Sequence, residues 1–287
     1  FTAKLVVSAT LENCAPQETE HFLGVLLAHY QTPQVEDQGA ALALTDTLSY
    51  LPLKRLTGAQ AQQVADFVLA QSRSRDPSLQ AAALQLFFRA SQTLPPEHPL
   101  RAAVARLRQE EHRFALPSLR YRYARVCGIP AEEAVGALSN QEVSDILLDN
   151  LKTATPWMVK VVNVELLSRY AACGRGSAMQ IAAHFANIVR VSEAVVVRQR
   201  AGRALLGIAP RLTGEQRNEI AVELAKALES GHYEFSKYIP QYLGAFMLWL
   251  PPAELDEVID YLAELLSHSA ASVAASALDV VGCVREN

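Results

Sequence analysis

The stretch EAVVVRQRAGRALLGIAPRLTGEQRNEIAVELAKALES, residues 193–230, decides the fold that we expect for this chain. Apolar residues recur at helical spacing over 197–208 and again over 220–228, which predicts two amphipathic helices. Thr213, followed three residues later by Gln216, is typical of a capping box at the start of the second helix. One such hairpin cannot bury its apolar face alone, so this stretch predicts neighbours of the same kind.

The pattern returns at a nearly constant interval along the chain. Anchors equivalent to Val197 follow at steps of 38 residues from position 159 to the C-terminus and at steps of 40 residues toward the N-terminus. The anchors are Gly39, Leu79, Leu119, Val159, Val197, Phe235 and Val273. The apolar residues are mainly Ala, Leu and Val and only 7% of the chain is aromatic, which favours packed helices over sheets. The sequence therefore predicts an all-α fold of stacked hairpins.

Three segments carry a likeness to a known family, namely RDPSL at 75–79, WMVK at 157–160 and VRQRA at 197–201. On these segments, and on the period, the chain resembles the HEAT-repeat (HEAT/armadillo-like) family from about Gln34 to its end, although Gly39, Ser236 and Ala274 depart from the pattern. The resemblance implies a right-handed α-solenoid of about six to seven HEAT-like helical hairpins. It also implies a single repeat domain over 1–287, with 1–33 as the end of a preceding or capping unit and 34–287 as repeats.

The periodicity also predicts where the helices lie. First helices are expected near 35–51, 78–94, 119–127, 156–172, 193–211, 233–250 and 270–284. Second helices are expected near 59–72, 97–110, 141–151, 177–190, 214–229 and 253–267, with further helices at 18–30 and 131–138 and an extended segment at 5–10. Pro240 should kink or split the helix that contains it.

Composition narrows the class of protein. No apolar run approaches the length of about 18 residues that a membrane helix needs. The four cysteines lie far apart without metal-ligand spacing, so we expect reduced, buried thiols and a cytoplasmic protein. Because the chain begins at Phe1 and has no signal-peptide pattern, we expect a piece of a longer protein.

The sequence offers no pattern that carries chemistry. The seven histidines are scattered and no HExxH motif occurs, so we expect no metal site. The turn GRGS at 174–177 is too short for a phosphate loop and lacks its lysine. No catalytic residue and no cofactor is predicted, and a non-enzymatic protein is favoured.

Charge is the most distinctive surface feature. Residues 76–125 carry 8 Lys/Arg against 4 Asp/Glu, whereas residues 215–287 carry 4 against 12. In solenoids of this type the second helices line the concave side, where the solvent-facing positions would form one largely acidic groove. The predicted binding residues are Glu142, Asp145, Asp149, His184, Glu219, Glu223, Glu257, Tyr261 and Glu264. This groove would hold a protein partner with a basic segment.

Other functions stay open at this point. Some HEAT-like proteins are DNA glycosylases, which would require phosphate contacts from 101–125 and 198–203, although a pI near 6.0 argues against nucleic acid. A lyase-type chaperone is a third alternative.

The last helix leaves a stacking face open, which allows a homodimer through it. The residues expected on that face are Val273, Ala277, Val280, Val281 and Val284.

Overall fold

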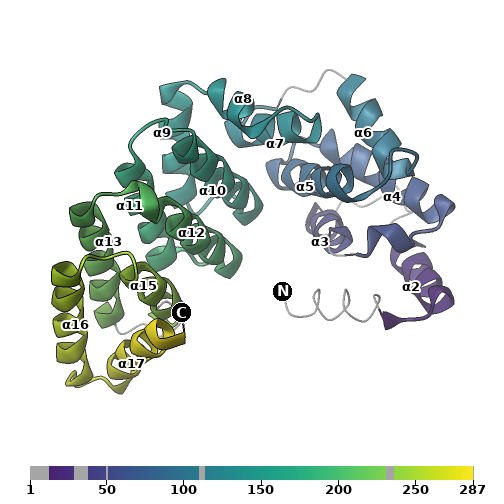
Figure 1. Cartoon of the computed structure of the whole chain (residues 1–287). Helices are drawn as coiled ribbons and strands as arrows, with labels where there is room; N and C mark the ends of the chain where they lie inside the picture. The colour runs from purple at the N-terminus through teal and green to yellow at the C-terminus, as the bar shows by residue number, and fades with distance from the viewer. Residues whose placement is uncertain (1–12, 29–37, 50, 110–113, 231–235, 287) are drawn as a thin grey trace. The chain divides into compact units, whose positions relative to one another are not determined.

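The computed structural model describes residues 13–28, 38–49, 51–109, 114–230 and 236–286, and these ranges contain helices and no β-strand (Figure 1). The all-α prediction is therefore confirmed for the described residues. The predicted extended segment 5–10 lies outside them.

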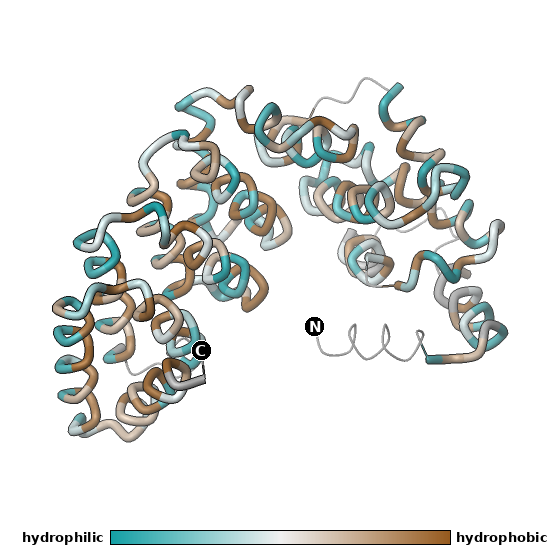
Figure 2. Tube along the Cα trace, viewed as in Figure 1, coloured by the Kyte–Doolittle hydropathy of each residue, from teal (hydrophilic) through white to brown (hydrophobic). Residues whose placement is uncertain are grey.

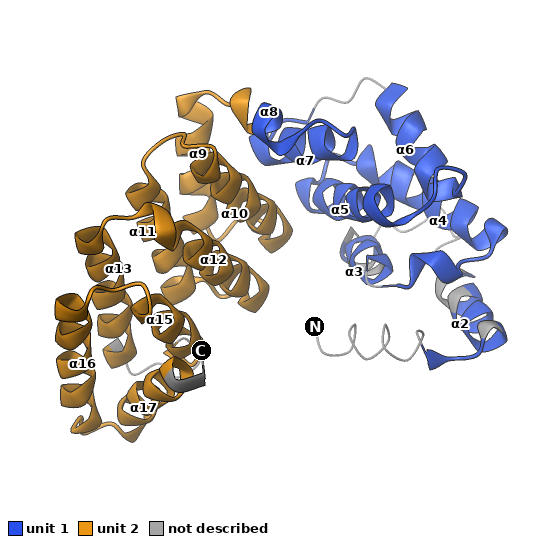
Figure 3. Cartoon of the chain, in the orientation of Figure 1, with its two compact units in different colours: residues 1–134 blue, residues 135–287 orange. Residues whose placement is uncertain are grey.

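The chain divides into two compact units, residues 1–134 and 135–287 (Figure 3). The helices of unit 1 are α2 (Pro16–Ala28), α3 (Gln38–Leu48), η1 (Leu53–Arg55), α4 (Gly58–Ser72), α5 (Pro77–Thr93), α6 (Pro99–Gln109) and α7 (Pro117–Val126). Helix α8 (Ala131–Gly136) contains the boundary. The helices of unit 2 are α9 (Asn140–Leu151), α10 (Trp157–Ala172), α11 (Ala178–Val191), α12 (Val195–Ile208), η2 (Ala209–Arg211), α13 (Gly214–Lys226), η3 (Ala227–Ser230), α15 (Ile239–Met247), α16 (Pro252–Leu266) and α17 (Ala271–Glu286).

Local sequence signals set many of these bounds. Thr213 accepts a hydrogen bond from the Gln216 backbone while Gln216 reaches back to Thr213, so the predicted capping box at the start of α13 is confirmed. The same reciprocal arrangement starts α4 and α9. Ser236 is helical, a turn follows at 237–238 and helix α15 begins at Ile239, so the helix expected over 233–250 is split just before Pro240, as predicted. Pro240 lies in the first turn of α15, where a residue without an N–H group leaves no intrahelical bond unmade.

The helices of each unit pack in two rows. In unit 2, α10, α12, α15 and α17 pack on one another in chain order, and we call them the first-helix row. Helices α9, α11, α13 and α16 do the same, and we call them the second-helix row. In unit 1, α3, α5 and α7 form one series and α2, α4 and α6 the other. Figure 2 shows the hydrophilic residues of α13 and α16 along the left edge of unit 2, with hydrophobic ones toward the neighbouring helices.

Most of the periodic anchors lie in the core between these helices. The buried ones are at most 3% exposed, namely Leu79, Leu119, Val159, Val197 and Val273. Burial of one such side chain contributes about 1.5–3 kcal/mol. Gly39 is exposed, and Phe235 lies outside the described residues.

The last helix differs from the expectation of an open stacking face. Val273, Ala277 and Val280 of α17 are at most 1% exposed, because α17 packs on α15 and α16. Its exposed large apolar residues are Leu278 and Val281. A homodimer through α17 stays a prediction; Val284, also expected on this face, is half-buried.

Arginines join helices that follow one another at the period of the fold. The Nη1 atoms of Arg211 and Arg175 donate to the carbonyls of Ala171 at 3.2 Å and Gly136 at 3.3 Å, which lie 40 and 39 residues earlier. Arg89 donates in the same way to the carbonyl of Ser49. Each of these carbonyls lies in the last turn of a helix or just past it, where backbone acceptors lack an intrahelical donor.

One glycine of α12 is required by close packing. A Cβ atom on the buried Gly202 would overlap the ring of Tyr242 on α15. The hydroxyl of Tyr242 donates to the carbonyl of Gln199, one turn before Gly202, at 3.4 Å. Gly207, near the end of the same helix, is exposed and has no atom within 4 Å of such a Cβ.

We predict that alanine has opposite effects at these two glycines. Gly202→Ala should lower the free energy of unfolding by about 1–3 kcal/mol, because it overpacks the contact between α12 and α15. Gly207→Ala should raise it by about 0.5–1 kcal/mol through helix propensity alone. Urea unfolding followed by circular dichroism measures both, and changes of the same sign would contradict this packing of α12.

Candidate functional site

All nine predicted binding residues lie on the second-helix row of unit 2. Asp145, Glu219, Glu223, Glu257 and Glu264 are exposed. The remaining four are half-buried, namely Glu142, Asp149, His184 and Tyr261. The packing of α9, α11, α13 and α16 in chain order brings them onto one row, as the sequence predicts. That this row lines a concave side stays a prediction.

The carboxylates of α9 are engaged locally. Glu142 completes the capping box with Ser139, and Asp145 accepts a hydrogen bond from Gln141 at 2.9 Å. Asp149 accepts from Lys152 Nζ at 2.7 Å, and this hydrogen bond raises the pKa of the lysine. Because these three carboxylates already have partners within or next to α9, they are less available to a binding partner than the sequence suggests.

The carboxylates of α13 and α16 link neighbouring helices or stand in solvent. Glu223 pairs with Arg190 Nη1 of α11 at 3.0 Å, and Glu257 accepts from Asn218 Nδ2 of α13 at 2.9 Å. Exposed pairs of this kind contribute at most about 1 kcal/mol and exchange readily. Glu219 and Glu264 are exposed and have no ion-pair partner among the described residues.

Tyr261 lies among these carboxylates on α16. Burial raises the pKa of its hydroxyl, and a hydrogen bond to Glu229 and the charge of Glu264 act in the same direction. The side chain is therefore a neutral hydrogen-bond donor at the edge of the row.

His184 is not solvent-facing, which corrects the expectation from the sequence. Helix α9 packs on α11 at this point, and Asn150 Nδ2 lies 3.1 Å from His184 Nε2. Burial lowers the pKa of His184 to about 4, so the ring is neutral at pH 7. With the ring proton on Nδ1, Nε2 accepts the hydrogen bond from the amide.

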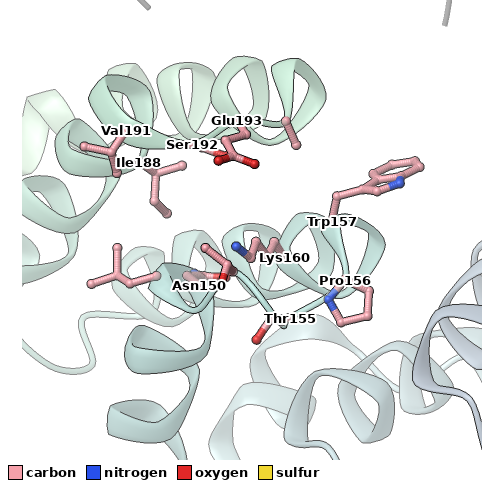
Figure 4. Close-up of a pocket in the computed structure, with 12 residues that line it drawn as sticks. Asn150, Thr155, Pro156, Trp157, Lys160, Ile188, Val191, Ser192 and Glu193 are labelled. Carbon is pink, nitrogen blue, oxygen red and sulfur yellow. The ribbon is translucent and has the colours of Figure 1, made fainter.

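Beside this contact lies a pocket that the sequence analysis missed (Figure 4). Its volume is about 400 Å³, and it is formed where α9 and α11 end and α10 and α12 begin. Its walls are Asn150, Leu151, Thr153, Thr155, Pro156, Trp157, Lys160, Ile188, Val191, Ser192, Glu193 and Ala194. The one signal available in the sequence was Asn150, a polar residue on the helix face that packs inward.

Two polar groups define the base of this pocket. Asn150 is 3% exposed, and its Oδ1 atom has no hydrogen-bond partner among the described residues. Lys160 is half-buried; burial lowers the pKa of its ammonium group, while the charge of Glu193 acts in the opposite direction. Figure 4 shows the Lys160 nitrogen between the segment that carries Asn150 and the one that carries Ile188 and Glu193.

Four of the arginines in the segments expected to contact phosphates are engaged within their own units. Arg122 and Arg198 are 1% and 2% exposed, and Arg122 lies over the ring of Phe88. Arg108 donates to the carbonyl of Val126 at 3.1 Å and Arg125 to that of Ile129 at 2.6 Å. Contacts of this kind hold the fold, whereas Arg106, Arg120, Arg200 and Arg203 of the same segments are exposed.

Other predicted features have mixed outcomes. The four cysteines are half-buried, not buried as expected, and none of them is joined in a disulfide in the described part of the chain. In the described part of the chain, no group of His, Cys, Asp and Glu could hold a metal ion. None of the helices described is both long and apolar enough to cross a bilayer.

Comparisons with known proteins give little further information. No family model and no curated protein matches the chain. Two similar structures are crystal structures of engineered proteins. One is 16% identical, with 92% of this chain and 68% of that chain covered and a TM-score of 0.37. The other is 15% identical, with 92% and 96% covered and a TM-score of 0.34. Scores this low carry no argument about function.

We predict that the buried His184 makes stability depend on pH. Its pKa is lowered on folding, so the folded state resists the proton that the unfolded chain takes up as pH falls below the usual value of about 6.5. The contribution of His184 to the free energy of unfolding is fully present above pH 6.5. It is lost as the pH falls toward 4, the pKa of His184 in the folded state. Between about pH 7.5 and pH 5.0 the wild type should lose about 2 kcal/mol more than His184→Gln.

Urea unfolding at both pH values measures this difference. His21→Gln, at an exposed position of α2, is the matched control and should keep the wild-type dependence. An identical slope in the wild type and His184→Gln would show that His184 does not differ between the folded and unfolded states.

Proposed function

We propose that the chain is a non-enzymatic interaction module whose second-helix row in unit 2 binds a basic segment of a protein partner. The observation that carries the proposal is the set of exposed carboxylates on adjacent helices, namely Glu219, Glu223, Glu257 and Glu264. Lys and Arg side chains presented along one segment would meet these charges in turn.

The proposal includes the architecture that the resemblance implies, a right-handed α-solenoid of about six to seven HEAT-like hairpins. Two features support it: each helix packs on the next helix of its own row, and side chains contact backbone groups 39–41 residues away. A stack of this kind presents one long surface per row, which suits an extended partner. The wide spacing of the four cysteines along the sequence suits a reducing compartment such as the cytoplasm.

Electrostatics favours a protein partner over nucleic acid. The chain has a net charge of -4, and the acidic residues outnumber the basic ones most strongly in the helices that form the proposed surface. Exposed charges steer a partner chiefly within a screening length of about 8–10 Å, so the attraction should weaken with added salt.

We predict that reversing three of these charges abolishes binding of a basic peptide. The variant is Glu219→Lys, Glu223→Lys and Glu257→Lys together, and the probe is a fluorescein-labelled octalysine peptide. Because binding depends on the local row, affinity measured by anisotropy at low salt should fall at least about tenfold. Circular dichroism should show unchanged helical content.

The matched control reverses three other exposed carboxylates, Glu132, Glu133 and Asp279, and therefore has the same net charge. It should keep the affinity within about threefold. Equal losses of affinity in both triple variants would show that the effect comes from net charge alone. No loss in either variant would exclude the second-helix row as the binding surface.

A further inference from the structure

The last hairpin of unit 2 consists of α16 and α17, which end the two helix rows (Figure 1). One side of α16 faces α13, because Glu257 accepts a hydrogen bond from Asn218 of that helix. Ile259 comes two residues after Glu257, about 200° around the helix, and therefore points away from α13. It is 46% exposed.

Helix α17 is open on the corresponding side. Val280 and Cys283 face Gly244 of α15, since a Cβ atom on this glycine would lie 3.2 Å from the Val280 carbonyl oxygen and 2.9 Å from the Cys283 Cβ. Leu278 and Val281 each come two residues before one of these, about 200° around the helix. They point away from α15 and are 58% and 53% exposed.

The same positions are covered in the preceding hairpin. At the period of 38 residues, Leu266 corresponds to Leu228, and these side chains are 43% and 0% exposed. Gly282 corresponds to Gly244, yet a Cβ atom on Gly282 would meet no atom within 4 Å. The preceding hairpin is covered because α16 packs on α13 and α17 on α15. The last hairpin thus leaves open the surface that one hairpin offers to the next, and we call it the end face; its large residues are Ile259, Leu266, Leu278 and Val281.

The end face is apolar and allows close approach. The small residues Ala263 of α16 and Ala271 and Gly282 of α17 are exposed on the same sides of these helices. Small residues between larger apolar ones let a second pair of helices pack closely. A contiguous apolar surface of this kind marks a site of protein association.

Acidic residues at the edge of the end face restrict how it can be covered. Asp256 and Asp260 of α16 are exposed, and Asp256 lies about 60° around the helix from Ile259. Two α16 helices packed on each other would bring four carboxylates together. Helix α17 is the better neighbour, since its exposed carboxylate, Asp279, lies about 100° farther around than Leu278 and away from Val281.

The size of the end face suits a weak dimer. Helices α16 and α17 have 15 and 16 residues. At about 1.5 Å per residue and about 10 Å per helix, they offer a face of roughly 23 by 20 Å, so a dimer buries on the order of 1,000 Å² in total. This is the lower limit for a specific interface.

We propose that two copies of this chain associate through the end face, with α16 of each copy packed on α17 of the other. One surface then serves both copies, and a two-fold axis parallel to the helices closes the contact. Ile259 lies seven residues before the end of α16 and Leu278 seven residues after the start of α17, so both are at the same height in the hairpin. This axis places Ile259 on the partner's Leu278. The carboxylates of the proposed function take no part, so either proposal can fail alone.

The experiment measures mass by sedimentation equilibrium of the whole chain from about 5 to 200 µM. The wild type should dimerise with a Kd of about 10–100 µM, as its interface is small. Ile259→Glu and Leu278→Lys should each weaken the dimer at least about tenfold, because each buries an unpaired charge. An equimolar mixture of the two variants should dimerise again, within about threefold of the wild-type affinity. In the mixed dimer the two new charges oppose each other, while the other half of the interface keeps Ile259 on the partner's Leu278.

Matched controls place the same charges on exposed leucines of unit 2 outside the end face. Leu148→Glu on α9 and Leu248→Lys on α15 replace side chains that are 58% and 53% exposed. Both should dimerise within about twofold of the wild type. Misfolding of Ile259→Glu or Leu278→Lys is excluded by recovery in the mixture. A wild type that stays monomeric at 200 µM, or a mixture that gains no mass, would overturn the proposal.

Discussion

The constraint on which this structure depends is that one helical hairpin has more apolar surface than it can cover by itself. Val159, Val197 and Val273 are separated by whole multiples of the period of 38 residues and are each at most 1% exposed. They are covered because each helix packs on the next helix of its own row. The period of the sequence is thus the number of residues in one hairpin, which buries its apolar surface against the next hairpin.

Stacking of this kind brings helix ends together as well as helix flanks. At several ends an arginine from the following hairpin satisfies the last carbonyls, as Arg211 does for Ala171 and Arg175 for Gly136. Where α9 and α11 end and α10 and α12 begin, the cavity instead contains a lysine, a glutamate and a buried amide. The pocket is therefore a local departure from the way in which other helix ends of this chain are filled.

The helices were predictable from the sequence because their signals are local. The capping box of Thr213 and the anchors from Leu79 to Val197 define helices that the structure has within a few residues of the expected bounds. The prediction that His184 faces solvent was wrong because the periodicity of α11 contains no information about Asn150 of α9, which packs against the ring. The pocket was missed for the same reason, since its walls come from four helices and meet only when the hairpins stack.

The formal charge gives an incomplete description of what a partner meets. The count of 26 basic against 30 acidic residues weights every arginine equally, yet Arg122 and Arg198 are at most 2% exposed. Arg108 and Arg125 donate to backbone carbonyls of their own unit. The carboxylates of α13 and α16 are instead exposed, and their known partners are surface groups that exchange readily. On the second-helix row of unit 2, exposed carboxylates follow one another on adjacent helices, so a partner there meets more acidic charge than the net charge of -4 implies.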